Sequence, residues 1–160
     1  MREIILGVAL LIGLGSAFSA DARDAEWDDV YYLAEALYFE SRSESDACQL
    51  EVSKVILTRT LQNRFKAPTI EQVVHAWSFD KYGDKVCQFS YYCDGKSDRM
   101  TNEYQKARAI RNASLFLAVV DFDIDGNDHY YAHKRVYPTW APYMTDTFVC
   151  DDHTIGKLKW

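Results

Sequence analysis

One predicted helical face of the chain ends in glutamates instead of leucines. Val30, Leu33, Leu37, Glu40 and Glu44 recur at intervals of three or four residues, which places them along one side of a helix. A carboxyl group in that register points toward the core, where an apolar environment raises its pKa and favours the protonated acid. Protonating a glycosidic oxygen requires a glutamic acid that keeps its proton near neutral pH. Glu40 is therefore the leading candidate for a catalytic acid.

The alternative for Glu40 is an ordinary solvated glutamate at the end of a helix, and periodicity alone does not separate the two readings. The role of Glu44 depends on where that helix ends. If the helix continues, Glu44 lies one turn beyond Glu40, and the like charge raises one of the two pKa values further. If the helix stops, Glu44 hydrogen-bonds loop backbone or pairs with Arg42 or Arg59.

Aromatic and polar side chains alternate between residues 77 and 98. Rings beside amides, hydroxyls and carboxylates are typical of saccharide grooves, because a ring can cover one face of a sugar. The alternative is that half of these rings fill the core. The rings are Trp77, Phe79, Tyr82, Phe89, Tyr91 and Tyr92.

Two other patterns could bind a metal ion, and both have plainer explanations. The segment Asp121–Asp125 begins like a calcium loop, but Ala132 stands at the twelfth position, where a bidentate glutamate is required, so an acidic turn is favoured. His129 and His133 are four residues apart in strand-like sequence, which separates them too far for easy chelation. We expect neither a metal nor another cofactor.

The N-terminus predicts an exported protein. The apolar run Ile4–Leu14 is followed by small residues up to Ala20, the order of a secretory signal that is too short to span a membrane comfortably. Residues 1–20 are expected to be removed, or else to serve as an anchor that holds the chain at the membrane transiently before release. Residues 21–160 then form one domain with one core, located in the periplasm or outside the cell.

Composition restricts the kind of partner. The formal net charge is −6, aromatic residues make up 14% of the chain, and no basic stripe is visible. These features argue against nucleic-acid binding. We expect a monomer.

The four cysteines lie beyond the export segment, and an even count in an exported chain favours two disulfides. We favour Cys87–Cys93, which closes a short loop and leaves Cys48–Cys150 to tie the C-terminal tail to a helix. A zinc site is the alternative, but no Cys-x-x-Cys pair is present. A cysteine peptidase is disfavoured because it needs a free thiolate.

The elements that must position these residues are mainly helical, and an α+β domain is predicted. We expect helices over 26–40, 47–63 and 102–120, and a short helix after Pro68 with Thr69 as its N-cap. Strands are expected over 129–132 and 147–150, and 78–100 is read as irregular. In the last long helix the predicted buried face comprises Tyr104, Ala107, Ile110, Ala113, Leu117 and Val120.

Three blocks together resemble the SleB-like cell-wall hydrolases, also called spore cortex-lytic enzymes, in the version of Gram-negative bacteria and their phages. The resemblance covers roughly residues 30–150. The blocks are Leu33–Glu44, the cysteine-bracketed loop Cys87–Asp98, and Asp125–Ala132 followed by Val136–Ala141.

The resemblance implies a lysozyme-like single domain that acts on peptidoglycan glycan strands, with Glu40 as acid/base. We expect Glu40 to protonate the MurNAc-β-1,4-GlcNAc bond and then to close a 1,6-anhydro ring, the lytic transglycosylase route. The alternatives are muramidase-type hydrolysis, with Asp94 as the least unsuitable second acid, and a peptidoglycan-binding module without catalysis. The enzyme would serve wall remodelling or, as an endolysin, phage lysis. The expected substrate-binding residues are Glu44, Gln88, Phe89, Ser90, Tyr130 and Trp140.

Overall fold

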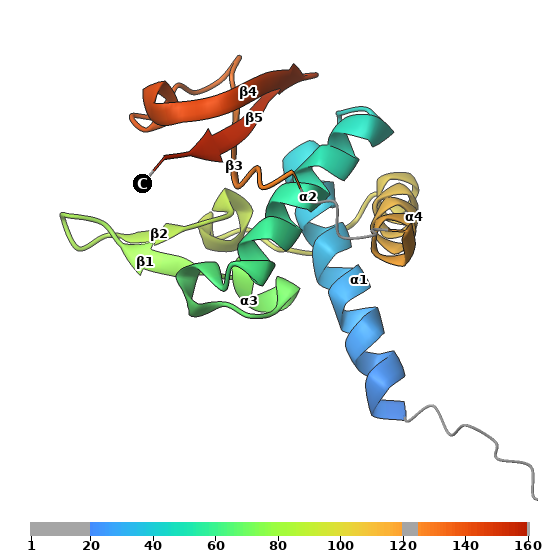
Figure 1. Ribbon diagram of the computed structural model, residues 1–160. Helices are drawn as coiled ribbons and strands as arrows, with labels where there is room; N and C mark the ends of the chain where they lie inside the picture. Colours follow the sequence, from blue (N-terminus) through green and yellow to red (C-terminus); the bar gives the residue numbers. More distant parts are fainter. Residues whose placement is uncertain (1–19, 120–124, 160) are drawn as a thin grey trace, which may run out of the picture.

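The computed structural model describes residues 20–119 and 125–159, with side chains from residue 26 onward (Figure 1). The predicted export segment therefore lies outside the described residues, apart from Ala20, and so does Asp121–Ile124 of the acidic segment. Within the described part of the chain, no helix has both the length and the apolar character to cross a membrane.

Four helices form the larger part of the domain. They are α1 (Ala20–Ser41), α2 (Asp46–Leu61), α3 (Ile70–Val74) and α4 (Glu103–Val119). Helix α1 contacts each of the other three, and the core lies along it (Figure 1). The N-cap prediction is confirmed at α3, because the Thr69 side chain accepts a hydrogen bond from the backbone N–H of Gln72.

The predicted apolar face of α1 is confirmed, since Val30, Leu33 and Leu37 are all buried. The helix ends at Ser41, so Glu40 lies in its last turn and Glu44 in the loop that follows. The predicted inner face of α2 is also confirmed, and its buried residues include Cys48, Val52, Val55 and Ile56.

Five strands make up two small antiparallel sheets. A hairpin pairs β1 (Trp77–Phe79) with β2 (Lys85–Cys87), and Figure 1 shows it extending away from the helices. The second sheet has the order β3-β5-β4, built from β3 (His129–Ala132), β4 (Met144–Cys150) and β5 (His153–Leu158). The two predicted strands correspond to β3 and β4, and the mainly helical α+β class is confirmed.

Two expectations about secondary structure were wrong. Residues 78–100 are not uniformly irregular, because they contain most of the β1–β2 hairpin and a short 3-10 turn, Ser90–Cys93. The predicted inner face of α4 is confirmed at Ala113, which is buried, and at Ile110 and Leu117, which pack against the core. It is wrong at Tyr104, which is 75% exposed, and at Ala107, and it left out the buried Ala109 and Phe116. The buried face also includes Asn112, a polar residue whose amide donates to the side chains of Asp46 and Gln49. Val120 lies outside the described residues.

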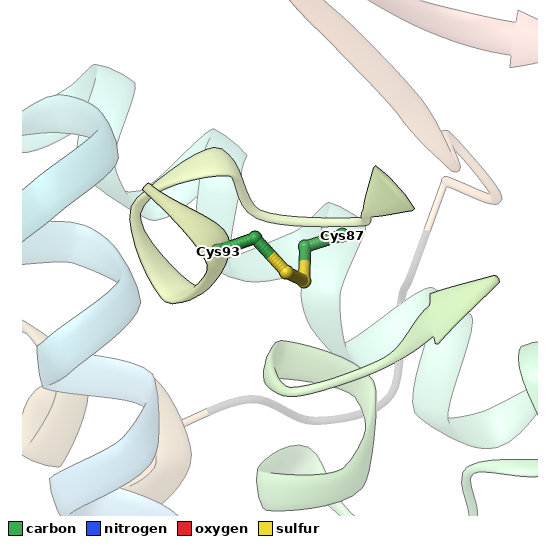
Figure 2. Close-up of a disulfide and its surroundings, with 2 residues drawn as sticks. All are labelled: Cys87 and Cys93. Atoms are coloured by element: carbon green, nitrogen blue, oxygen red, sulfur yellow. A yellow bond between two sulfur atoms is a disulfide. The ribbon is translucent and has the colours of Figure 1, made fainter. Parts of the chain in front are cut away.

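The two disulfide predictions have different outcomes. Cys87 and Cys93 form a disulfide that joins the end of β2 to the 3-10 turn, as Figure 2 shows. Cys48 and Cys150 are free thiols, so the expected second disulfide is not formed in this structure. The Cys48 sulfur instead donates to the backbone carbonyl oxygen of Cys150, at 3.0 Å.

Candidate active site

Glu40 lines a pocket of about 280 Å³ where the helical part of the domain meets the three-stranded sheet. One wall comes from the end of α1 and the following loop and includes Glu40 and Glu44. The rest of the lining comes from the end of β3 and the β4–β5 turn and includes Ala132, Asp152 and His153. The pocket therefore brings together segments that are more than one hundred residues apart in the sequence.

The Glu40 carboxyl group is partly buried and has one hydrogen-bond donor. The Tyr130 hydroxyl, on β3, donates to Glu40 Oε2 at 3.3 Å. Burial raises the pKa of Glu40, and the Tyr130 hydrogen bond and the charge of Arg59 lower it by less, so the pKa stays above its ordinary value. The pocket thus favours the protonated acid while keeping two groups ready to stabilise the carboxylate.

Arg59 lies beneath Tyr130 and was not selected from the sequence as a site residue. Its side chain is buried in α2, and its Nε donates to the backbone carbonyl oxygen of Asp128 at 2.8 Å. The guanidinium lies over the rings of Phe89 and Tyr130, at 5.7 and 5.8 Å from their centroids. Arg59 therefore supports the Tyr130 ring and places a positive charge near Glu40.

Asp128 fixes the start of β3, and hence the position of Tyr130. Its carboxylate accepts hydrogen bonds from Arg64 Nη2 at 2.6 Å and from the backbone N–H of Leu158 at 3.1 Å. Its Oδ1 also lies 2.8 Å from Nδ1 of His129. Burial by itself raises the pKa of Asp128, but these hydrogen bonds and positive charges outweigh it and leave the pKa below its ordinary value. The buried carboxylate is therefore a structural anion.

Glu44 lies in a loop beyond the end of α1, so the prediction that it hydrogen-bonds loop backbone applies. Its Oε2 accepts a hydrogen bond from the backbone N–H of Asp152 at 3.0 Å, which ties the loop to the β4–β5 turn. Arg108 of α4 holds the same loop by donating to the carbonyl oxygens of Arg42 at 3.2 Å and Glu44 at 2.6 Å. The loop that forms one pocket wall is therefore fixed from two sides.

Four other predicted substrate-binding residues lie away from the Glu40 pocket. Phe89 is 1% exposed and packs in the core, so it has no open ring face; this corrects its assignment as a stacking residue. Gln88 is half-buried at the end of the hairpin, and Ser90 is exposed at the start of the 3-10 turn. Trp140 is half-buried and packs edge to face against His129 and Tyr131.

The sequence reasoning also missed Glu35. It is 5% exposed and accepts a hydrogen bond from the Tyr91 hydroxyl at 3.1 Å, and it lies 3.4 Å from Nε2 of His75. Burial raises the pKa of Glu35, and these two contacts only partly offset it. The available signal was a lone charged residue between Leu33-Ala34 and Ala36-Leu37. For Arg59 the signal was its position one turn after Val55 on the buried face of α2.

Comparison with known protein families identifies the family of this chain. A family model described as Cell Wall Hydrolase matches residues 43–154. The chain belongs to the cell wall hydrolase family. Searches of curated proteins and of solved structures found no significant match. The matched span includes Glu44, Tyr130 and His153, and it begins three residues after Glu40.

Membership of the cell wall hydrolase family indicates peptidoglycan as the substrate, and it confirms the SleB-like resemblance at the family level. Peptidoglycan lies outside the cytoplasmic membrane, so the substrate agrees with the expected export. The Gram-negative or phage version of the family stays a prediction. The same holds for the part that Glu40 takes in the reaction, because the family match does not include it.

Proposed function

We propose that this cell wall hydrolase cleaves peptidoglycan glycan strands at the MurNAc-β-1,4-GlcNAc bond, with Glu40 as a single acid/base. The observation that supports this most is the state of the Glu40 carboxyl group. It lines the pocket, its pKa is raised by burial, and a hydroxyl donor is in contact with the oxygen that carries the charge after proton transfer.

In the first step Glu40 gives its proton to the glycosidic oxygen. The bond from that oxygen to C1 of MurNAc breaks, GlcNAc leaves with a free 4-hydroxyl, and C1 acquires oxocarbenium character. Glu40 is then a carboxylate, and the Tyr130 hydrogen bond and the Arg59 charge stabilise it in that form.

In the second step the Glu40 carboxylate takes the proton from the C6 hydroxyl of MurNAc. The C6 oxygen bonds to C1 and closes the 1,6-anhydro ring, and Glu40 returns to its protonated state. The cycle needs one carboxyl group and no water, so the product carries an anhydro end. This lytic transglycosylase route suits a pocket in which the other two acids, Glu44 and Asp152, are held by contacts within the protein.

Hydrolysis of the same bond is the alternative, and it requires a second carboxylate to activate water. Asp94, the acid expected from the sequence, is hydrogen-bonded to Lys96 in an exposed turn and does not line the Glu40 pocket. The acids that do line it are Glu44, which bonds the Asp152 backbone, and Asp152, which pairs with Lys134. Both are held in structural contacts, which favours the route with one carboxyl group.

The glycan strand is proposed to contact Glu44 in the pocket wall and to continue past Gln88, Ser90 and Trp140, outside the pocket. Tyr130 contributes through its bond to Glu40. Phe89 supports Arg59 from the core and is not proposed as a sugar contact, because its ring is enclosed.

We further propose that the enzyme acts after export, in the periplasm or outside the cell, as a monomer that the N-terminal segment can hold at the membrane transiently. Wall remodelling and phage lysis both fit a short catalytic domain of this kind. A binding module without catalysis is the proposal of a different class, and it predicts that the protein associates with sacculi but releases no fragments.

The test is mass spectrometry of fragments released from purified sacculi by the wild type, Glu40→Gln and Glu44→Gln. We expect wild-type fragments with anhydro ends, lighter by one water than hydrolytic fragments. Glu40→Gln should lower release at least about 10²-fold, the usual loss when a general acid is removed. Glu44→Gln, which keeps an acceptor for the Asp152 N–H, should lower release far less than Glu40→Gln, because Glu44 is proposed to contact the glycan and not to transfer the proton.

An active Glu40→Gln protein, or one in which only Glu44→Gln is inactive, would refute the assignment of the acid. Hydrolytic masses would refute the lyase route while leaving the bond and the acid in place. Binding to sacculi with no released fragment from the wild type would instead support the module without catalysis.

A further inference from the structure

A second cluster of chemically active side chains lies behind the pocket wall. Glu44, Cys48 and His153 are 7%, 0% and 3% exposed, and one ligand atom of each lies within 4.8 Å of the others. Cys150 extends the cluster, because its sulfur, that of Cys48 and a carboxylate oxygen of Asp151 also lie within 4.8 Å of one another. The cluster joins the first turn of α2 to the β4–β5 turn.

One atom of this cluster is buried without a partner. Nδ1 of His153 makes no hydrogen bond although it is shielded from solvent. Leaving a buried polar atom unsatisfied costs about 1–3 kcal/mol, so such an atom calls for an explanation. Because a ring nitrogen of His153 lies within 4.8 Å of the Cys48 sulfur and a Glu44 oxygen, a cation bound among these three groups would supply the missing partner for this ring.

The other groups also keep donor capacity. The Cys48 thiol donates to the Cys150 carbonyl oxygen, which leaves the sulfur lone pairs open. The Glu44 carboxylate accepts from the Asp152 backbone through one oxygen and from the Ser43 hydroxyl, at a longer 3.4 Å, through the other. Two carboxylate oxygens offer about four lone-pair directions, so an acceptor position remains.

We propose that Cys48, His153 and Glu44, with Cys150 as the fourth ligand, bind a transition-metal ion, and that zinc is the ion that fits. Sulfur, imidazole nitrogen and carboxylate oxygen are the ligand atoms zinc takes in tetrahedral sites, whereas calcium and magnesium take oxygen alone. Binding displaces the two thiol protons, and the two thiolates and the Glu44 carboxylate together more than neutralise the divalent ion.

The geometry requires only a small contraction. Zinc lies about 2.3 Å from sulfur and about 2.0 Å from nitrogen, so tetrahedral ligand atoms are about 3.3–3.8 Å apart. Among Glu44, Cys48 and His153, the present separations of up to 4.8 Å are reduced to that range by rotating side chains, and Cys150, whose sulfur lies within 4.8 Å of that of Cys48, has to turn toward the same point. The ion has an entry path, because Glu44 and His153 line the Glu40 pocket.

The sequence does not reveal this ligand set, because it lacks the Cys-x-x-Cys pair that usually indicates a zinc site. Glu44 and Cys48 are four residues apart across the start of α2, and Cys150 and His153 are three apart across the β4–β5 turn. Each pair forms a short chelate, and only the fold brings the two pairs together. The expectation of no metal is thus replaced by this proposal.

The site would act as a clamp for the pocket. It joins the loop that holds Glu44 to the turn that holds His153, and both segments line the pocket. The His153 ring packs edge to face against Tyr130, 5.3 Å between centroids, and Tyr130 bonds Glu40. Filling the site therefore fixes the support of the Tyr130 ring. The proposal does not depend on Glu40 being the acid.

The experiment measures metal affinity on the full chain, kept reduced and stripped of metal. Zn²⁺ is titrated in competition with a chromophoric chelator, and Co²⁺ serves as a spectroscopic probe. We expect tight binding of one ion per chain, with tetrahedral cobalt d–d bands and a thiolate-to-cobalt charge-transfer band. Cys48→Ser and His153→Gln should each weaken Zn²⁺ binding by about 100-fold or more, since loss of an outer-shell partner alone costs 10–100-fold.

His133→Gln is the matched control, because His133 follows β3 close to the same sheet but lies outside the cluster. It should leave Zn²⁺ affinity unchanged. Circular dichroism establishes that each variant is folded, and Cys150→Ser replaces Cys48→Ser if the latter unfolds. Because no glycan is involved, a failure here is distinct from a failure of the Glu40 assignment.

Three results would overturn the site. The first is a wild type that binds Zn²⁺ no more tightly than Cys48→Ser. The second is a cobalt spectrum without a thiolate band. The third is protein isolated from the periplasm that holds no zinc and contains a Cys48–Cys150 disulfide, shown by alkylation of free thiols and peptide mass, because oxidation removes both sulfur ligands.

Discussion

The Tyr130→Phe substitution tests whether Glu40 is tuned by its neighbours as the structure indicates. The Tyr130 hydroxyl donates to the charged form of Glu40, so it lowers the pKa of a carboxyl group that burial raises. Removing the hydroxyl takes away one of the two interactions that lower the pKa of Glu40, so the effect of burial dominates more strongly and the pKa rises further. Because the general acid must start protonated, the alkaline limb of the pH–activity profile moves to higher pH.

The size of the shift follows from the hydrogen-bond length. A hydrogen bond to a charged group is worth about 1.5–3 kcal/mol when it is short and well aligned. The bond here is 3.3 Å long, beyond the usual range, so about 1 kcal/mol is a fair value. Since one pKa unit corresponds to 1.36 kcal/mol, the alkaline limb should move up by about 0.7 of a unit.

The maximal rate should fall at the same time, by about 5-fold, because about 1 kcal/mol of support is lost for the carboxylate that develops in the first step. The assay is clearance of purified sacculi between pH 4 and pH 9 at constant ionic strength. Tyr131→Phe is the control, since it removes the hydroxyl of the next residue on β3 and leaves the Glu40 hydrogen bond intact. An alkaline limb that stays in place or moves to lower pH in Tyr130→Phe would refute the reasoning.

Three further predictions concern stability. Burial raises the pKa of Glu40 above 4.5 in the folded protein, so the wild type loses stability as the pH rises above 4.5 and Glu40 ionises. Glu40→Gln does not ionise, so its free energy of unfolding in urea should rise relative to that of the wild type between pH 5 and pH 8. The Cys87–Cys93 bridge closes a loop with a sequence separation of 6, so Cys93→Ser should lower the free energy of unfolding by about 2 kcal/mol, and adding reductant should erase the difference. Arg108→Met removes charged hydrogen bonds to the Glu44 loop and should cost about 2 kcal/mol in the same assay; equal stability would contradict that anchoring role.

The parts of the fold that the sequence predicted correctly depend on neighbours within one or two turns. The buried faces of α1 and α2 follow from helical periodicity, and the Thr69 cap follows from a side chain that reaches a backbone N–H three residues ahead. The Cys87–Cys93 bridge is of the same kind, because its two residues are close in the chain whatever the rest of the fold does.

The parts that it missed depend on distant partners. Strand β5 reads as polar and lies between β3 and β4, where its burial comes from strands on both sides. Asn112 can be buried on α4 because Asp46 and Gln49 of α2 accept its amide hydrogens, and no pattern within α4 indicates these partners. Cys48 and Cys150 were paired by elimination, whereas the fold also places Glu44 and His153 beside Cys48 and Asp151 beside both cysteines.

The choice between Glu35 and Glu40 shows why burial alone does not identify an acid. Both lie on α1, and burial raises the pKa of both. Glu35 lies in mid-helix, enclosed at 5% exposure, where Tyr91 and His75 occupy its carboxyl group. Glu40 lies in the last turn, where the helix stops and β3 crosses, so one side contacts Tyr130 and the other faces the pocket. The end of α1 is what opens the Glu40 carboxyl group to the pocket.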